Sequence, residues 1–183
     1  MKTTISRASG FTLIEALITI SIAAILASIA IPGFTSMVEN NRVSSSSNDF
    51  LSALMLTRSE AAKRSISVSL CTSSNNSACS KSLDDYSHGW IIFTDCNGDG
   101  VITKTVTTCD LDGDGTNDPD KIIRVHGPIK GISISSAQAT DSLTYQFSGR
   151  STNTTFSIGP ASDDIRKQIT VSITGRARLV SVP

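Results

Sequence analysis

Four closely spaced aspartates are the side chains of this sequence best suited to bind a metal ion. They occupy positions one, three, five and nine of a loop whose sixth residue is glycine, and they are Asp110, Asp112, Asp114 and Asp118. Calcium loops take oxygen ligands at these positions. Position twelve is Lys121 where such loops carry a glutamate, and residues 95–100 repeat only the first half of the pattern. The spacing therefore predicts either a calcium site or a set of Asx and glycine turns.

Two arginines near the C-terminus, Arg176 and Arg178, are placed to bind phosphate. If Ile169, Val171 and Ile173 face the core of one continuous strand, the same alternation turns both arginines outward, ~6–7 Å apart at ~3.3 Å per residue. The arginine fork suits successive backbone phosphates. Exposed arginines also protect an edge strand from aggregation, which is the alternative role.

Three neighbouring residues belong to the same predicted phosphate site. Gly175 precedes the arginines and permits a bulge or a close approach of the backbone to a ligand. Arg166 and Lys167 stand at the start of the same predicted strand and widen the basic patch.

Nothing in the sequence predicts catalysis. The two histidines, His88 and His126, lie in no nucleophile or metal motif, and we expect turn or strand-end positions for them. The prediction is a protein that is not an enzyme and has no small-molecule substrate.

The number of cysteines is even, and no two of them form a CxxC motif. They are Cys71, Cys79, Cys96 and Cys109. Zinc and redox sites use closer spacings, so two disulfides formed in an oxidising compartment are expected. Three pairings are open, and the simplest joins Cys71 to Cys79 and Cys96 to Cys109.

Charge is zero overall but unevenly distributed. Residues 82–120 hold nine acids against Lys104 alone, whereas residues 121–183 hold eight bases against three acids. A neutral chain carries no general attraction to nucleic acid or anionic membrane, so any such binding must come from the basic last third.

The N-terminal region is apolar and is expected to anchor the chain in a membrane. Residues 11–31 contain one charge, Glu15, and are long enough to span a bilayer, with Lys2 and Arg7 before them predicting a cytoplasmic N-terminus. A secretory signal peptide is the alternative. A carboxylate in this stretch is costly unless it has a partner, or unless it forms a capping box with Thr12.

Beyond Pro32 the apolar residues recur at helical spacing, at Val43, Phe50, Leu54 and Ala61, which predicts one helix from about residue 12 to 64. From residue 65 the period becomes two, with short apolar strands between Gly, Asn, Asp and Pro turns. The expected fold is α+β: a long N-terminal helix packed on an antiparallel sheet, or on two small sheets.

Residues 9–15, SGFTLIE, resemble the class III signal of type IV pilins and type II secretion pseudopilins. The resemblance implies cleavage by a prepilin peptidase after Gly10, N-methylation of Phe11, and pairing of the Glu15 carboxylate with the Phe11 amine of a neighbouring subunit. It also implies a kink or melted turn at Pro32.

Residues 89–100, GWIIFTDCNGDG, and residues 169–176, ITVSITGR, are similar to segments of the GspH/FimT branch of minor pilins and pseudopilins. The resemblance implies four segments: a leader (1–10), a transmembrane assembly helix (11–32), an amphipathic helix (33–64) and a β-rich pilin domain (65–183). It places the chain in the inner membrane with a periplasmic domain, and in an extracellular pilus after assembly.

Residues 175–178, GRAR, look like the GRxR motif through which FimT-type minor pilins bind DNA during natural transformation. We therefore expect a minor type IV pilin of competence that binds double-stranded DNA and other pilins. The alternatives are a GspH-like pseudopilin of the type II secretion system and a minor pilin that only primes pilus assembly.

Overall fold

The computed structural model describes residues 10–80, 85–105, 108–138, 140–161 and 164–182. The chain divides into two compact units, residues 1–40 and residues 41–183. Helix α1 (Leu13–Arg64) contributes its first part to one unit and its last part to the other.

In the first unit, α1 starts with half of the expected capping box. The Thr12 hydroxyl accepts a hydrogen bond from the Glu15 backbone N–H (3.3 Å), which satisfies one of the free amides at the helix start. By length and composition alone, α1 holds one stretch that can cross a membrane.

The helix continues through Pro32, so the melted turn expected there is not present. A proline removes one intrahelical hydrogen bond, and its neighbours keep the helical conformation here.

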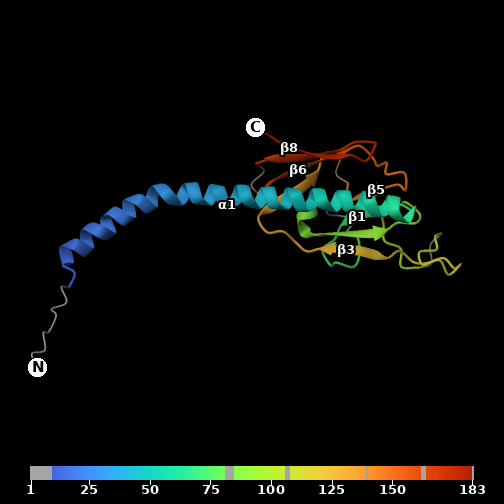
Figure 1. Cartoon of the computed structure of the whole chain (residues 1–183), viewed down its shortest axis with the longest axis horizontal. Coiled ribbons are helices and arrows are strands. Elements are labelled where there is room, and N and C mark those ends of the chain that lie inside the picture. Colours follow the sequence, from blue (N-terminus) through green and yellow to red (C-terminus); the bar gives the residue numbers. More distant parts are fainter. Residues whose placement is uncertain (1–9, 81–84, 106–107, 139, 162–163, 183) are drawn as a thin grey trace, which may run out of the picture. The chain divides into compact units, whose positions relative to one another are not determined.

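The second unit contains two four-stranded antiparallel sheets (Figure 1), as the period-two pattern predicted. The first has the order β3-β2-β1-β5, and the second has the order β4-β6-β7-β8. A short 3-10 helix, η1 (Tyr86–His88), precedes β2. The strands are β1 (Val68–Thr72), β2 (Trp90–Thr94), β3 (Ile122–His126), β4 (Ile132–Ser136), β5 (Ser142–Tyr145), β6 (Thr154–Pro160), β7 (Lys167–Val171) and β8 (Ala177–Ser181).

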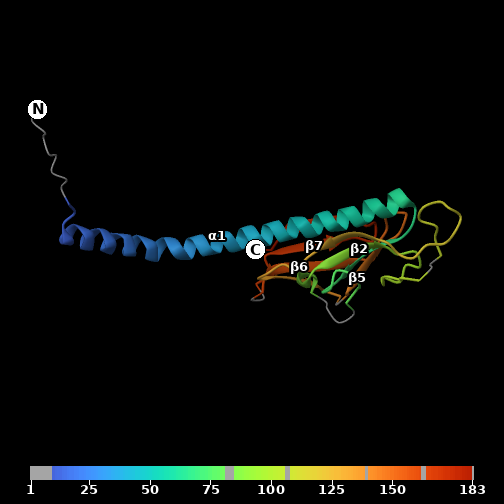
Figure 2. The ribbon, with the colours of Figure 1, turned by 90° about the horizontal axis from the view of Figure 1, so that it is seen from below.

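The core of this unit lies between the last part of α1 and both sheets. Figure 2 shows this part of the helix running along the strands. Phe50 is fully buried and contacts the rings of Tyr86, Trp90 and Phe156 at centroid distances of 5.2, 5.2 and 4.9 Å. Val43, Phe50, Leu54 and Ala61, the predicted helical stripe, are all buried. Removing one such aromatic ring typically costs about 3–5 kcal/mol.

Four positions depart from the sequence-based expectations. The apolar periodicity also predicts Met55 in the helical stripe and Phe147 in a strand, but Met55 is exposed, and Phe147 is 65% exposed and lies beyond the end of β5 at Tyr145. The four serines of residues 44–47 predict a polar helix face, but Ser47 is fully buried, and its hydroxyl donates to the Val43 carbonyl (2.6 Å). This internal bond lets a serine replace an apolar residue against the sheet. Ile173 is the fourth position and belongs to the candidate site.

Two disulfides and the hydrogen bonds of one carboxylate, Asp85, fix loops of this unit. Both disulfides join the nearer partners, Cys71 to Cys79 and Cys96 to Cys109, with Cα–Cα distances of 5.6 and 5.7 Å. Asp85 accepts hydrogen bonds from the backbone N–H groups of Ile134 and Ser87. Burial raises the pKa of Asp85, but these bonds, together with those from the Ser87 and Ser133 side chains, outweigh it and lower the pKa below its ordinary value.

Candidate nucleic-acid interface and acidic loop

The C-terminal arginines lie on a β-hairpin and not on one continuous strand. β7 ends at Val171, residues 172–176 turn back, and β8 pairs antiparallel with β7 so that Val171 is opposite Ala177 and Thr170 is opposite Arg178. The expectation of a core-facing Ile173 is therefore wrong: this residue lies in the turn and is 58% exposed.

Both arginines are exposed on the outer face of the second sheet, as predicted. Ala177 and Leu179 pack against the core from the other face of β8. Arg178 therefore faces outward by the alternation along the strand, and Arg176, just before β8, is exposed as well. Their neighbours on β7 and the turn are Thr170 and Ser172. Within the described part of the chain, neither arginine forms an ion pair with a carboxylate. The pair therefore presents positive charge at the start of edge strand β8.

Arg166 and Lys167 are not beside this pair. Lys167 is opposite Ser181, at the far end of the hairpin from the turn, and four residues of strand correspond to ~13 Å. The Arg166 guanidinium contacts the Asp164 carboxylate (Nε–Oδ2 2.9 Å), which offsets its charge. The predicted patch is therefore two groups, one at each end of the hairpin.

Gly175 makes a close backbone approach, but to the chain itself. Its φ is +73°, a left-handed conformation, and a Cβ there would collide with the carbonyl oxygen of Gly149. The Gly175 N–H donates to the Ser172 carbonyl (2.7 Å) and closes the turn. Glycine is required at this position by both the backbone angle and the missing space.

Sequence reasoning missed one contact of this site, that of Arg58 on α1. Its guanidinium donates to the Thr174 carbonyl (Nη2–O 3.1 Å) across 116 residues of sequence. No local pattern could have found a partner so far away in the chain.

A polar groove adjoins the turn, because the turn residue Ile173 is part of its lining. It has a volume of about 680 Å³ and is lined by Ile173, Arg150 and hydroxyl or amide side chains that include Ser142, Thr144 and Gln146. Arg150 gives this groove a positive charge close to the β7–β8 hairpin that carries Arg176 and Arg178, called the arginine hairpin below.

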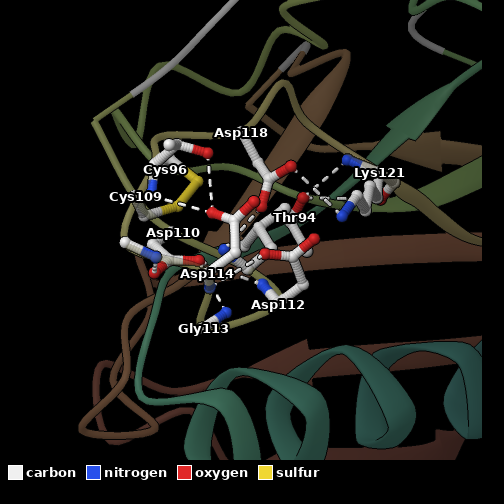
Figure 3. Close-up of polar contacts among 12 residues, drawn as sticks. Thr94, Cys96, Cys109, Asp110, Asp112, Gly113, Asp114, Asp118 and Lys121 are labelled. Carbon is white, nitrogen blue, oxygen red and sulfur yellow. Dashed lines mark hydrogen bonds and ion pairs between the residues drawn. A yellow bond between two sulfur atoms is a disulfide. The ribbon is translucent and has the colours of Figure 1, made fainter.

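The aspartates of the acidic loop converge as the calcium spacing predicted, with one exception (Figure 3). Asp110, Asp112 and Asp118 each offer a carboxylate oxygen, and these oxygens lie within 4.8 Å of one another. Asp114 is not part of this group; its carboxylate accepts from the backbone N–H and the hydroxyl of Thr116 (2.8 and 2.6 Å).

The same carboxylates also cap the backbone of the loop. Asp110 accepts hydrogen bonds from the N–H groups of Gly115 and Gly113 (2.8 and 2.6 Å), which lower its pKa. Asp118 accepts from the Leu111 N–H (2.8 Å) and pairs with Lys121 (3.3 Å). The geometry is that of Asx turns and is compatible with both predicted roles, so calcium here stays a prediction.

Residues 95–100, which repeat the first half of the calcium-loop pattern, form a turn held by their own hydrogen bonds. Asp95 is buried and accepts the backbone N–H groups of Asp99 and Gly100 (3.1 and 2.9 Å). Asp120 supports it by accepting the Cys96 N–H (3.2 Å). Burial, together with the charges of Asp95 and Asp99, raises the pKa of Asp120 despite its hydrogen bonds.

The histidines have structural contacts. His126 stacks on the buried ring of Trp90 with a centroid distance of 3.9 Å. His88 ends η1, where its Nδ1 lies 3.2 Å from the Asp85 carbonyl.

Two family models match the chain. Residues 46–175 match the family described as type II transport protein GspH, which covers more than half of the sequence. The chain belongs to this family. Residues 5–31 match the prokaryotic N-terminal methylation motif. Arg176 and Arg178 lie just beyond the matched GspH segment.

Solved structures of minor pilins share the fold of this GspH-family chain. Two crystal forms of the type IV minor pilin FimU from Pseudomonas aeruginosa match with TM-scores of 0.54 and 0.52, at 18% and 17% identity. They cover 79% and 75% of this chain and 92% and 91% of theirs. The minor pseudopilin EpsH of the Vibrio cholerae type II secretion system is more distant, with a TM-score of 0.45, 15% identity, and coverage of 76% and 97%. No curated protein sequence matches.

This GspH-family chain is thus a minor type IV pilin or pseudopilin with a long N-terminal helix packed on antiparallel sheets. Pilins are structural proteins and not enzymes as a class. The apolar start of α1 and the methylation motif support a membrane-anchored pilin.

Proposed function

We propose that this minor pilin is incorporated into a type IV pilus and binds extracellular double-stranded DNA for natural transformation. The observation that carries the proposal is a pair of exposed arginines, Arg176 immediately before edge strand β8 and Arg178 on it, two residues apart and without a carboxylate partner in the described part of the chain. Phosphate contact by such a pair is independent of base sequence.

The chemistry of the surface suits a phosphate backbone. At ~3.3 Å per residue the two arginines project ~6–7 Å apart, and each guanidinium can donate two parallel hydrogen bonds to one phosphate. Thr170, directly opposite Arg178, is exposed and adds a hydroxyl donor next to it. The contact area is small, so one subunit binds weakly.

The N-terminal part of the proposal follows from the methylation motif. Cleavage by a prepilin peptidase after Gly10 would leave Phe11 as the N-methylated terminus, with Glu15 as the carboxylate that pairs with the Phe11 amine of a neighbouring subunit. The match over residues 5–31 supports this assignment. The chain would then pass from the inner membrane into the pilus.

The test is DNA retardation by the full chain in non-ionic detergent. We expect Arg176→Gln with Arg178→Gln to weaken binding of a duplex at least tenfold while the circular dichroism spectrum and melting temperature stay unchanged. The matched control is Arg124→Gln with Lys130→Gln, which removes the same charge from exposed positions on β3 and before β4. Equal binding by the wild type and the folded hairpin variant would exclude the proposal.

A pseudopilin of the type II secretion system is the second candidate, because the matching family is described as a type II transport protein. Such a subunit would contact other pseudopilins or exported proteins and would give no DNA retardation at low salt. Genes for a pilus or for a secretion system next to the gene of this chain would separate the two.

A further inference from the structure

Arg58 forms a link between α1 and the arginine hairpin. Arg58 lies in the last two turns of the helix, and its Nη2 donates to the Thr174 carbonyl at 3.1 Å. Among the described residues, no other donor reaches this carbonyl. A hydrogen bond from a charged group to a backbone carbonyl is stronger than a neutral one.

The guanidinium lies directly over Gly149. A Cβ on Gly149 would come within 3.2 Å of the Arg58 Nε and 3.5 Å of its Nη2, and the φ of Gly149 is +74°. The Gly149 carbonyl in turn packs closely against Gly175. Gly149 therefore contacts both Arg58 and the glycine of the turn.

The turn itself has few other restraints. Its other hydrogen bonds are mostly internal. Gly175 N–H donates to the Ser172 carbonyl (2.7 Å), and Ser172 N–H donates to the Arg176 carbonyl (3.0 Å). The Ser172 hydroxyl accepts from Arg176 N–H (3.3 Å) and also bonds the Thr174 hydroxyl (2.8 Å) and the Arg176 carbonyl (3.4 Å). Among the described residues, one backbone hydrogen bond reaches the turn from outside the hairpin, the long one from the Ser151 N–H to the Ile173 carbonyl (3.3 Å). Arg58 is thus the main polar tie between this turn and the rest of the unit.

We propose that Arg58 is a positioning residue for the DNA-contacting arginines. By bonding the Thr174 carbonyl over Gly149, it fixes the turn from which Arg176 starts and so sets the spacing between Arg176 and Arg178. A fixed backbone reduces the conformational entropy that phosphate binding would otherwise cost. This inference rests on the proposed DNA binding for its function, but the restraint on the turn is a property of the free protein.

The restraint is tested first, without DNA. Hydrogen exchange of the full chain in non-ionic detergent, read by mass spectrometry on peptides that span residues 172–178, compares the wild type with Arg58→Gln. We expect about tenfold faster exchange in the variant, because a charge-assisted hydrogen bond is lost. The control is Arg64→Gln, which removes the same charge from the same helix but breaks only the pair with Glu60. Unchanged exchange in Arg58→Gln overturns the proposal.

DNA binding then separates positioning from direct contact. We expect Arg58→Gln to weaken duplex binding about fivefold in the wild type and to have no effect when Arg176→Gln and Arg178→Gln are already present. An equal loss in both backgrounds would mean that Arg58 contacts phosphate itself and would overturn the proposal.

Two results keep the outcomes distinguishable. A wild-type chain that binds no DNA removes the proposed function, whereas faster exchange in Arg58→Gln would still show the restraint. If Arg58→Gln does not fold, Arg58→Lys serves instead, because it keeps the charge and the aliphatic stem and loses the planar fork. We expect about threefold faster exchange in that variant, and wild-type exchange would overturn the proposal.

Discussion

At the residue scale, Gly175 is the position of the candidate site least able to change. We expect Gly175→Ala to destabilise the protein by about 2–3 kcal/mol, because a left-handed φ and a collision with the Gly149 carbonyl act together. A domain of this size loses roughly 3–4 °C in melting temperature per kcal/mol, so thermal unfolding should show a decrease of about 6–12 °C.

Gly98→Ala is the matched control for this change. Gly98 has nearly the same φ, +72°, but a Cβ there would meet nothing within 4 Å. It therefore carries the backbone penalty without the collision, and its melting temperature should fall by only about half as much. Equal losses in both variants would mean that the close approach to Gly149 contributes nothing to stability.

At the element scale, the helix and the strands were largely readable from periodicity, and the hairpin was not. The helical stripe through Phe50 and Leu54 and the alternation in the strands follow from burial on one face. Ile173 continued the alternation of Ile169 and Val171, so the sequence favoured one strand. The outward direction of both arginines was still correct, because the antiparallel register places Arg178 opposite Thr170 on the same face.

The long-range contacts that position the site could not be predicted from the sequence. Arg58 and Thr174 are 116 residues apart, and Gly149 meets Gly175 across a sheet boundary. Local patterns describe which face a residue occupies, but they contain no information on which distant segment covers it. The ion pair of Arg166 with Asp164 was likewise not predicted from the sequence.

The acidic loop is the second element with a testable role. Calorimetric titration with calcium separates the two predicted roles of this loop. A calcium site would bind only in the millimolar range, since Lys121 replaces the bidentate glutamate and pairs with Asp118. Asp110→Asn should abolish the heat, because Asp110 supplies one of the three converging carboxylates. The absence of both heat and thermal stabilisation in the wild-type chain would assign these aspartates to turn formation alone.

At the scale of the whole molecule, the two ends of the chain have separate tasks in the proposed function. The hairpin would contact DNA, and the N-terminal part of α1 would hold the subunit in the membrane and then in the fibre. Because the two compact units are distinct, a change in the first should leave the chemistry of the second intact. Salt provides one check of the second unit, since two phosphate contacts predict about a tenfold loss of affinity between 50 and 200 mM salt.

Glu15 provides the corresponding check of the first unit. We expect Glu15→Leu to leave the chain in the inner membrane but absent from sheared pili, measured by immunoblot of both fractions from the native host. The leucine is more compatible with the apolar stretch, so insertion is preserved, whereas the carboxylate that would pair with a neighbouring Phe11 amine is lost. Glu39→Gln is the control on the same helix, outside the apolar stretch. Normal recovery of Glu15→Leu in the pilus fraction would contradict a pairing role, while unchanged DNA retardation by the same variant would show that assembly and DNA contact belong to different parts of the chain.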